Sequence, residues 1–346
     1  MRSLCLTFAV LGPLAGACHH LPPYPTPRVT YGAAPIELPL VQLPEDQTRL
    51  YVLVETGSMG EQLWFFDTGY SHTTCDAAAL AQEGVPTRKT LSTTRGELGK
   101  VRLEAATLPD IDLGGHTVHA PRCAVRDLPG TSSIPDGPGY IVTGVLGTNV
   151  LRRFVVEVDP AAGVLRLHEP GTLTLPEPIR LRREGLFGPR LMAPATLDGR
   201  ETWLILDYGA AGTYLDAERL GLPLTREQPG VWRGTGSSNT SARTLQIHHA
   251  DSVWFGTTQT SPIDVIHRDR GPFSPGLLGM DVLGELHLFI DYPHREASAT
   301  AVEAKELPVV GSEGWSEVWS APNGARGRVV IPKIFTSWLN VHVLER

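Results

Sequence analysis

Two aspartates at the ends of apolar segments are the residues of this sequence whose type and position suggest chemistry. Asp67 directly follows residues 64–66 (Trp-Phe-Phe), and Asp207 directly follows residues 204–206 (Leu-Ile-Leu). Such segments normally lie inside a fold, where an isolated charged carboxylate is destabilising by several kcal/mol. We therefore expect each acid to be neutralised, hydrogen-bonded or paired.

A pair of such acids facing each other could hydrolyse peptide bonds. Like charges a few ångströms apart do not both ionise freely, so the pair shares one proton and titrates in two separate steps. One carboxylate can then deprotonate a water molecule held between them while the other protonates the substrate carbonyl. Gly69 and Gly209, two positions after each acid, let the chain turn sharply and offer amide groups nearby. This reaction forms no covalent intermediate, and the sequence predicts neither a metal site nor a cofactor.

The chain contains an internal repeat that includes both acids. Residues 67–80 align without gaps on residues 207–220, with six identities in fourteen positions. Residues 144–159 align in the same way on residues 276–291, with six identities in sixteen positions. Chance gives about one identity in each window. A duplicated unit is the simplest explanation, and a pseudo-twofold axis between two such units would bring the equivalent acids face to face.

The repeat and the composition predict a mainly β fold of two lobes with short helices. The 36 glycines and 29 prolines separate short β-type runs rather than long helical patterns. We place the first lobe at residues 36–168, a Pro-rich linker at 169–178 and the second lobe at 179–301. Residues 302–346 have no repeat partner, and whether they add a strand or cover one lobe stays open.

The acid motif and its neighbours resemble those of the aspartic peptidases. Residues 67–71 (Asp-Thr-Gly-Tyr-Ser) match the D-T-G-x-S signature after an apolar strand, and residues 145–147 and 277–279 match the family's second element, two apolar residues and a glycine. Over nearly all of residues 36–301 the chain is similar to two retropepsin-type lobes fused in the pepsin-like manner. The resemblance implies a bilobal acid-protease fold that acts on peptide or protein substrates. It also implies a catalytic dyad with supporting residues: Asp67 and Asp207 as the acids, and Thr68, Gly69, Ser71 and Gly209 in support.

The second motif departs from the family pattern. Tyr208 stands where the family has a Thr or Ser whose hydroxyl braces the partner lobe, and Ala211 stands where a Ser or Thr bonds the catalytic carboxylate. Without those hydrogen bonds the pKa of Asp207 is expected to rise. Because a fold does not fix a function, two alternatives stay open. One is a non-catalytic protein that keeps the cleft for binding extended peptides, and the other is a dimer that pairs two copies of Asp67.

Two segments are expected to form β-hairpin flaps over the cleft. The resemblance places them at residues 93–103, with Gly96, and at residues 232–245, with Gly234. Hairpin tips rich in Gly and Ser can close over an extended peptide. The alternative is that both are exposed connecting turns without substrate contact.

The first residues have the pattern of an export signal. A basic residue precedes the apolar stretch 4–11, and small residues lead into Cys18. This resembles a bacterial lipoprotein signal, in which residues 1–17 are removed and Cys18 is lipidated. We expect an extracytoplasmic protein, anchored in the periplasm or at the outer membrane as a lipoprotein, or secreted if Cys18 is unmodified. Residues 18–35 would then form a Pro-rich tether.

Charge and cysteine content restrict the partners and the compartment. The 37 acidic and 30 basic residues give a net charge of −7 and are evenly spread, which disfavours binding to nucleic acid. We expect a monomer. Cys75 and Cys123 remain once the export segment is set aside; in an oxidising compartment they could form a disulfide, or each could be a buried free thiol.

Overall fold

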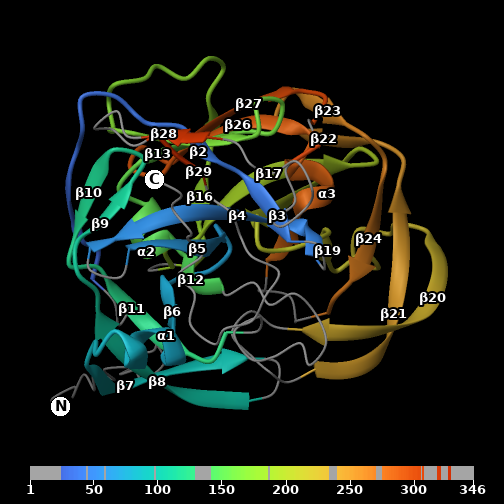
Figure 1. The fold of residues 1–346 in the computed structure, drawn as a ribbon. Helices are drawn as coiled ribbons and strands as arrows, with labels where there is room; N and C mark the ends of the chain where they lie inside the picture. The colour runs from blue at the N-terminus through green and yellow to red at the C-terminus, as the bar shows by residue number, and fades with distance from the viewer. Residues whose placement is uncertain are drawn as a thin grey trace, which may run out of the picture.

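The chain forms a mainly β structure with a few short helices, as predicted (Figure 1). It is seen here in a computed structural model that describes residues 25–43, 46–57, 60–96, 99–128, 142–185, 188–233, 240–269, 275–304, 306–307, 318–320 and 326–328. Most of the described strands belong to three sheets of eleven, ten and six strands. We call them the N-terminal sheet, the C-terminal sheet and the shared sheet.

The N-terminal sheet contains Asp67 at the end of one of its central strands. Its strand order is β1-β10-β9-β4-β5-β12-β6-β11-β8-β7, with β3 paired to β4. The strands are β1 (Arg28–Thr30), β3 (Val41–Leu43), β4 (Asp46–Thr56), β5 (Gly60–Phe66), β6 (Thr74–Asp76), β7 (Thr87–Gly96), β8 (Gly99–Thr107), β9 (Ile111–Leu113), β10 (His116–His119), β11 (Arg122–Arg126) and β12 (Val142–Leu146).

The C-terminal sheet contains Asp207 in the equivalent place. Its order is β20-β21-β24-β19-β25-β18-β17-β22-β23, with β16 paired to β17. The strands are β16 (Arg182–Arg183), β17 (Leu191–Leu197), β18 (Arg200–Leu206), β19 (Tyr214–Leu215), β20 (Leu224–Arg233), β21 (Thr240–Ala250), β22 (Val253–Phe255), β23 (Thr258–Thr260), β24 (Ile263–His267) and β25 (Gly276–Leu278).

The same pairing pattern recurs around the two aspartates. The strand before each acid runs parallel to a later strand, β5 with β12 and β18 with β25. The strand after each acid pairs antiparallel with that later strand, β6 with β12 and β19 with β25. Each aspartate therefore lies at the start of the turn that joins two central strands, where the chain ends one strand and leaves the sheet.

The shared sheet is built from both halves of the chain. Its order is β15-β27-β26-β13-β14-β2, and the central contact is the antiparallel pair β13–β26. The strands are β2 (Leu38–Pro39), β13 (Val155–Asp159), β14 (Val164–His168), β15 (Ile179–Arg180), β26 (Leu286–Asp291) and β27 (Glu296–Ala301). In Figure 1 the strands β13, β26 and β27 lie together near the top, between the blue-green and the orange parts of the chain.

The helices are short and begin close to the repeated motifs. They are α1 (Ala77–Gln82), α2 (Thr148–Leu151) and α3 (Met280–Leu283). Asp76 caps α1 by accepting a hydrogen bond from the Ala79 amide at 3.0 Å, as the sequence suggests for an acid before a helix. In the part of the chain that is described, no helix is long and apolar enough to cross a membrane.

Buried apolar side chains join the sheets. One cluster includes Phe66 and Tyr208 beside the two aspartates, and Phe154 and Leu288 toward the shared sheet. A disulfide between Cys75 and Cys123 links β6 to β11, which settles the question that the sequence left open. In the predicted C-terminal extension the structure describes a hairpin of β28 (Val318–Ser320) and β29 (Arg326–Arg328), and most of that segment lies outside the described residues.

Candidate active site

Asp67 and Asp207 begin equivalent turns at the ends of β5 and β18. The Asp67 amide donates to the Leu146 carbonyl of β12 at 3.2 Å, and the Asp207 amide donates to the Leu278 carbonyl of β25 at 3.0 Å. These bonds carry each parallel ladder one residue beyond the strand and fix the backbone at the acid. The apolar strands therefore deliver the carboxyl groups at a defined place, as the sequence pattern suggested.

The two carboxyl groups meet. Their side chains hydrogen-bond to each other, and both residues are buried, Asp67 at 3 % exposure and Asp207 at 8 %. The glycines pack reciprocally, because a Cβ atom on Gly69 would overlap the Asp207 carboxyl and one on Gly209 would overlap the Asp67 carboxyl. A side chain at either glycine would push the acids apart. This contact is what the pseudo-twofold arrangement requires.

The pKa values of both carboxyl groups are raised. Burial is the main cause for each, because it disfavours the charged form, and the charge of Asp207 raises the pKa of Asp67 further. Hydrogen bonds from the Gly69 and Gly209 backbones oppose the shift. Two carboxylates in contact in a buried site hold one proton between them over a range of pH, so one is a base and the other an acid at the same time.

The Thr68 hydroxyl links the two turns, and the side chain of the equivalent residue in the second turn makes no such hydrogen bond within the described part of the chain. Thr68 donates from Oγ1 to the Leu206 carbonyl at 2.8 Å and accepts from the Tyr208 amide at 3.1 Å. Tyr208 occupies the equivalent position but is fully buried, with its ring 5.3 Å from that of Phe66. The Tyr208 hydroxyl has no hydrogen-bond partner among the described residues. Bracing through a side-chain hydroxyl is therefore one-sided.

Two residues that the sequence analysis did not single out hold the far ends of the turns. Asn149 of α2 accepts from the Thr73 amide at 2.5 Å, and Asp281 of α3 accepts from the amide and hydroxyl of Thr213 at 2.9 and 2.8 Å. Asn149 and Asp281 are equivalent in the internal repeat, 132 positions apart. A polar residue repeated two positions after the glycine of the second family element was the signal that could have identified them.

Two arginines lie close enough to act on the dyad electrostatically. Arg190, just before β17, lowers the pKa of both acids, and Arg49 of β4 lowers that of Asp67. Tyr292, after β26, is also a neighbour, because the charges of both acids raise its pKa beyond the effect of burial. These residues come from segments without a motif, so no sequence signal marked them.

The structure describes some of the remaining predicted site residues and leaves others outside the described part of the chain. Ser71 makes no hydrogen bond to Asp67 in the described part of the chain. Gly96 ends β7 and pairs with Gly99 of β8, so a hairpin stands where the first flap was expected. The second expected flap is the hairpin of β20 and β21, but Gly234 lies outside the described residues, as does Cys18. The roles of both hairpins in substrate binding stay predictions.

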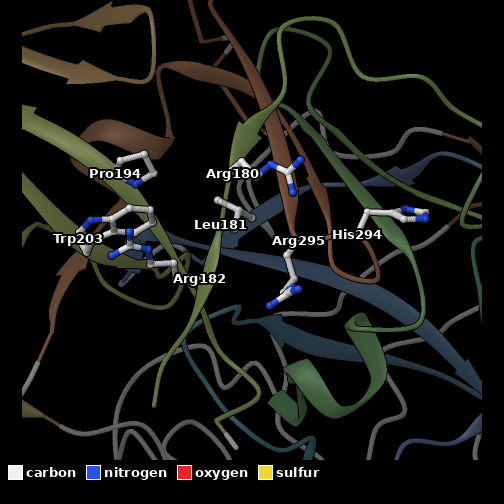
Figure 2. Close-up of a pocket in the computed structure, with 7 residues that line it drawn as sticks. All are labelled: Arg180, Leu181, Arg182, Pro194, Trp203, His294 and Arg295. Carbon is white, nitrogen blue, oxygen red and sulfur yellow. The ribbon is translucent and has the colours of Figure 1, made fainter. Parts of the chain in front are cut away.

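A basic pocket of about 540 Å³ lies at the junction of the shared and C-terminal sheets. Figure 2 shows Arg182 against Trp203 and Pro194, while Arg180, Arg295 and His294 lie on the other side of Leu181. The Arg182 guanidinium stacks on the Trp203 ring at 3.9 Å. The cationic groups therefore do not gather around one point, as a built site for a single anion would require.

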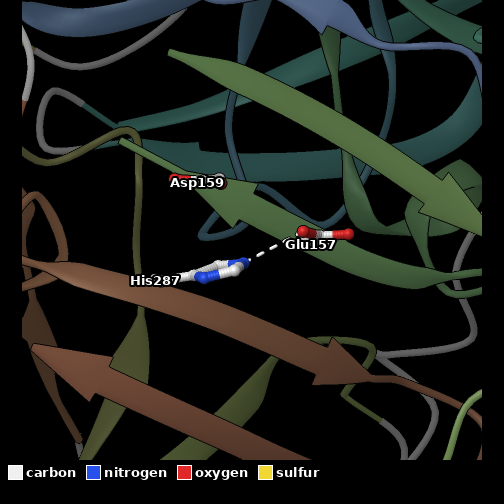
Figure 3. A group of neighbouring side chains, drawn as sticks. All are labelled: Glu157, Asp159 and His287. Carbon is white, nitrogen blue, oxygen red and sulfur yellow. Dashed lines mark hydrogen bonds and ion pairs between the residues drawn. The ribbon is translucent and has the colours of Figure 1, made fainter. Parts of the chain in front are cut away.

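A cluster of Glu157, Asp159 and His287 in the shared sheet has ligand atoms within 4.8 Å of one another (Figure 3). Glu157 accepts from Arg166 at 2.7 Å and contacts His287 and His168 at 2.9 and 2.6 Å. The Arg166 guanidinium also lies 3.7 Å from Asp159. A cationic side chain thus already occupies the space between the acids, and the cluster is an ion-pair network rather than a metal site.

Comparison with known proteins bears on the C-terminal sheet. No curated protein matches the chain. Residues 193–282 match a protein-family model described as aspartyl protease. The match contains Asp207 and Gly209 and extends through β25 into α3, so it covers the half whose motif departs most from the signature. That stretch of the chain is therefore similar to an aspartyl protease domain.

Proposed function

We propose that this chain is an aspartic endopeptidase formed by two lobes, with Asp67 and Asp207 as its catalytic dyad. The observation that carries the proposal is the contact between two buried carboxyl groups supplied by equivalent turns of two sheets. The aspartyl protease match at residues 193–282 supports it independently. Structural ion pairs also bury carboxylates, but they pair them with cations, whereas these acids contact each other.

The reaction follows from the shared proton. The ionised carboxylate takes a proton from a water molecule, whose oxygen attacks the peptide carbonyl carbon, while the protonated carboxyl gives its proton to the carbonyl oxygen. The tetrahedral intermediate then collapses. The C–N bond breaks, and the leaving nitrogen receives a proton from the dyad. One hydroxyl of the intermediate gives its proton back to the dyad as the new carboxyl group forms. The dyad ends with one proton, as it began.

Cleavage of an unfolded protein substrate across acidic to neutral pH tests the proposal. The wild type should cleave, and both Asp67→Asn and Asp207→Asn should lose activity by several orders of magnitude. Asp251→Asn, at an aspartate whose side chain is 88 % exposed, is the matched control and should behave as wild type. Since the pKa values of the dyad are raised, the rate should decline on the alkaline side only well above the ordinary pKa of an aspartate.

One observation favours a non-catalytic peptide-binding protein instead. Tyr208 fills the place of a bracing hydroxyl with a buried ring, so the second turn is held differently from the first. In that case the wild type cleaves nothing at any pH but still binds unfolded peptides. The dimeric alternative predicts that only Asp67→Asn abolishes cleavage, and the contact between Asp67 and Asp207 within one chain argues against it.

We also propose that the protein works outside the cytoplasm as a lipoprotein. The support is the sequence pattern that leads into Cys18, and the disulfide at Cys75–Cys123 suits an oxidising compartment. Replacing Cys18 by Ser should move the protein from the membrane fraction to the soluble extracytoplasmic fraction.

A further inference from the structure

Arg190 connects the C-terminal half of the chain to the turn that contains Asp67. Its Nη1 donates to the Gly69 carbonyl at 3.1 Å, across 121 positions of sequence. The rest of the guanidinium is held by Glu184, which accepts from Nε at 2.6 Å and from Nη2. The Arg190 side chain is 23 % exposed and that of Glu184 is 27 % exposed. A planar guanidinium bound at two edges in this way has little freedom to move.

The Gly69 backbone is the part of the turn in contact with both acids. Its α-carbon packs against the Asp207 carboxyl so closely that no Cβ fits, and its amide hydrogen-bonds to Asp67. A shift of the Gly69 peptide would therefore change the separation of the two carboxyl groups. The Arg190 bond restrains the carbonyl of that same residue.

The Arg190 bond lies next to two turns that only one side-chain hydroxyl, that of Thr68, links in the part of the chain that is described. Thr68 binds the Leu206 carbonyl, but the Tyr208 hydroxyl makes no equivalent hydrogen bond among the described residues. The Arg190–Gly69 bond ties the Asp67 turn to the C-terminal half of the chain in addition to the two hydrogen bonds of the Thr68 hydroxyl.

We infer that Arg190, held by Glu184, is a positioning residue that fixes the Asp67–Gly69 turn against Asp207 and compensates for the brace lost at Tyr208. The inference rests on the proposed function for its effect on catalysis. Arg190 acts through the Gly69 backbone, because its guanidinium is committed to Glu184 and to the Gly69 carbonyl.

The charge of Arg190 has a second effect on the same site. It lowers the pKa of both acids, opposing the burial that raises them. Among the described residues, Arg49 of β4 also lowers the pKa of Asp67, and Tyr292 is a neutral neighbour of both acids. Tyr214 of β19 also lies close enough for the Asp207 charge to raise its pKa. Removing the Arg190 charge should therefore move both limbs of the pH–rate profile to higher pH.

Three variants of the full chain separate position from charge. Arg190→Met removes both, Arg190→Lys keeps the charge but cannot bind Glu184 and Gly69 together, and Glu184→Gln keeps the guanidinium but loses the ion pair. Arg182→Met is the matched control, an arginine stacked on Trp203 and without a contact to the dyad. The measurements are kcat and KM across pH, and hydrogen exchange of the amides at residues 67–71.

The inference predicts a distinct pattern. Arg190→Met should lower kcat about 10- to 100-fold with KM changed less than about threefold, because sub-ångström displacement of reacting groups affects the chemical step. Its pH profile should move upward, whereas Arg190→Lys should keep the wild-type profile with a reduced kcat. Hydrogen exchange at residues 67–71 should accelerate in all three variants, least in Glu184→Gln, and should be unchanged in Arg182→Met.

Failure of this inference is distinguishable from failure of the proposed function. If the wild type cleaves and the Arg190 variants match it in kcat and in hydrogen exchange, the positioning role is wrong and the peptidase proposal stands. If the wild type cleaves nothing, the proposed function is wrong, and the exchange rates at residues 67–71 alone decide whether Arg190 holds the turn. Equal exchange in wild type and Arg190→Met overturns the inference in either case.

Discussion

At the scale of single residues, Tyr208 shows how the second turn departs from the first. Its side chain is fully buried, and its hydroxyl has no hydrogen-bond partner among the described residues. Burial raises the pKa of the Tyr208 hydroxyl above its ordinary value, so the hydroxyl stays protonated. The ring fills space beside Phe66 that a threonine would leave empty. At this position packing replaces the hydrogen bond that Thr68 makes in the other turn.

Tyr208→Phe should therefore leave the protein as stable as wild type or about 1 kcal/mol more stable, because an unpartnered buried hydroxyl carries a desolvation cost. Tyr208→Thr should instead lower the free energy of unfolding by about 3 kcal/mol, since the cavity left by the ring outweighs one new hydrogen bond. Urea denaturation of both variants measures this. A loss of more than about 1 kcal/mol in Tyr208→Phe would show that the hydroxyl has a partner after all.

At the scale of elements, the shared sheet depends on a buried carboxylate. The Glu157 side chain on β13 is 7 % exposed and contacts His287 of β26 (Figure 3). It also contacts His168 of β14, so it joins three strands. Burial opposes its ionisation, but the hydrogen bonds from the two histidines and the charge of Arg166 outweigh burial and lower the pKa of Glu157 to about 2. The carboxylate thus stays charged under acidic conditions.

Glu157→Gln should destabilise the protein by about 2 kcal/mol at pH 5 to 7, the range for a charge-assisted hydrogen bond left without its charge. Because the folded-state pKa is below the unfolded one, this contribution is fully present above the unfolded pKa of a glutamate and is lost as pH falls toward 2. The difference in unfolding free energy between wild type and variant should therefore shrink below about pH 4. A difference that stays constant down to pH 2 would contradict the assigned pKa.

The sequence predicted the elements that carry a repeated pattern and missed those that do not. Asp67, Asp207 and their glycines follow from apolar strands and from self-similarity, both of which are local or repeated along the chain. Arg190 lies near the dyad only because β17 folds back beside β18, and a single unrepeated arginine gives no sign of that contact. The sequence left the formation of the disulfide undecided for the same reason. Parallel pairing of β6 with β11 brings Cys75 close to Cys123, and no local pattern encodes this pairing.

At the scale of the whole molecule, the shared sheet makes the two halves of the chain one structure. Its central pair joins β13 and β26, where Val156 is opposite Ile290 and both are fully buried. The dyad needs one acid from each half, so its geometry depends on this sheet. The disulfide lies within the N-terminal half and does not connect the two.

A cut in the connector between β14 and β15 should therefore leave the molecule assembled. Gly171 in this connector is exposed, so a specific protease site inserted there is accessible. After cleavage the halves should elute together in gel filtration and keep the peptidase activity proposed for the intact chain, because the β13–β26 ladder and its buried side chains hold them without a covalent link. Ile290→Asp in the cut chain places a charge in that ladder and should release the halves, with loss of activity. Separation of the halves without this substitution would mean that the connector, rather than the shared sheet, keeps Asp67 against Asp207.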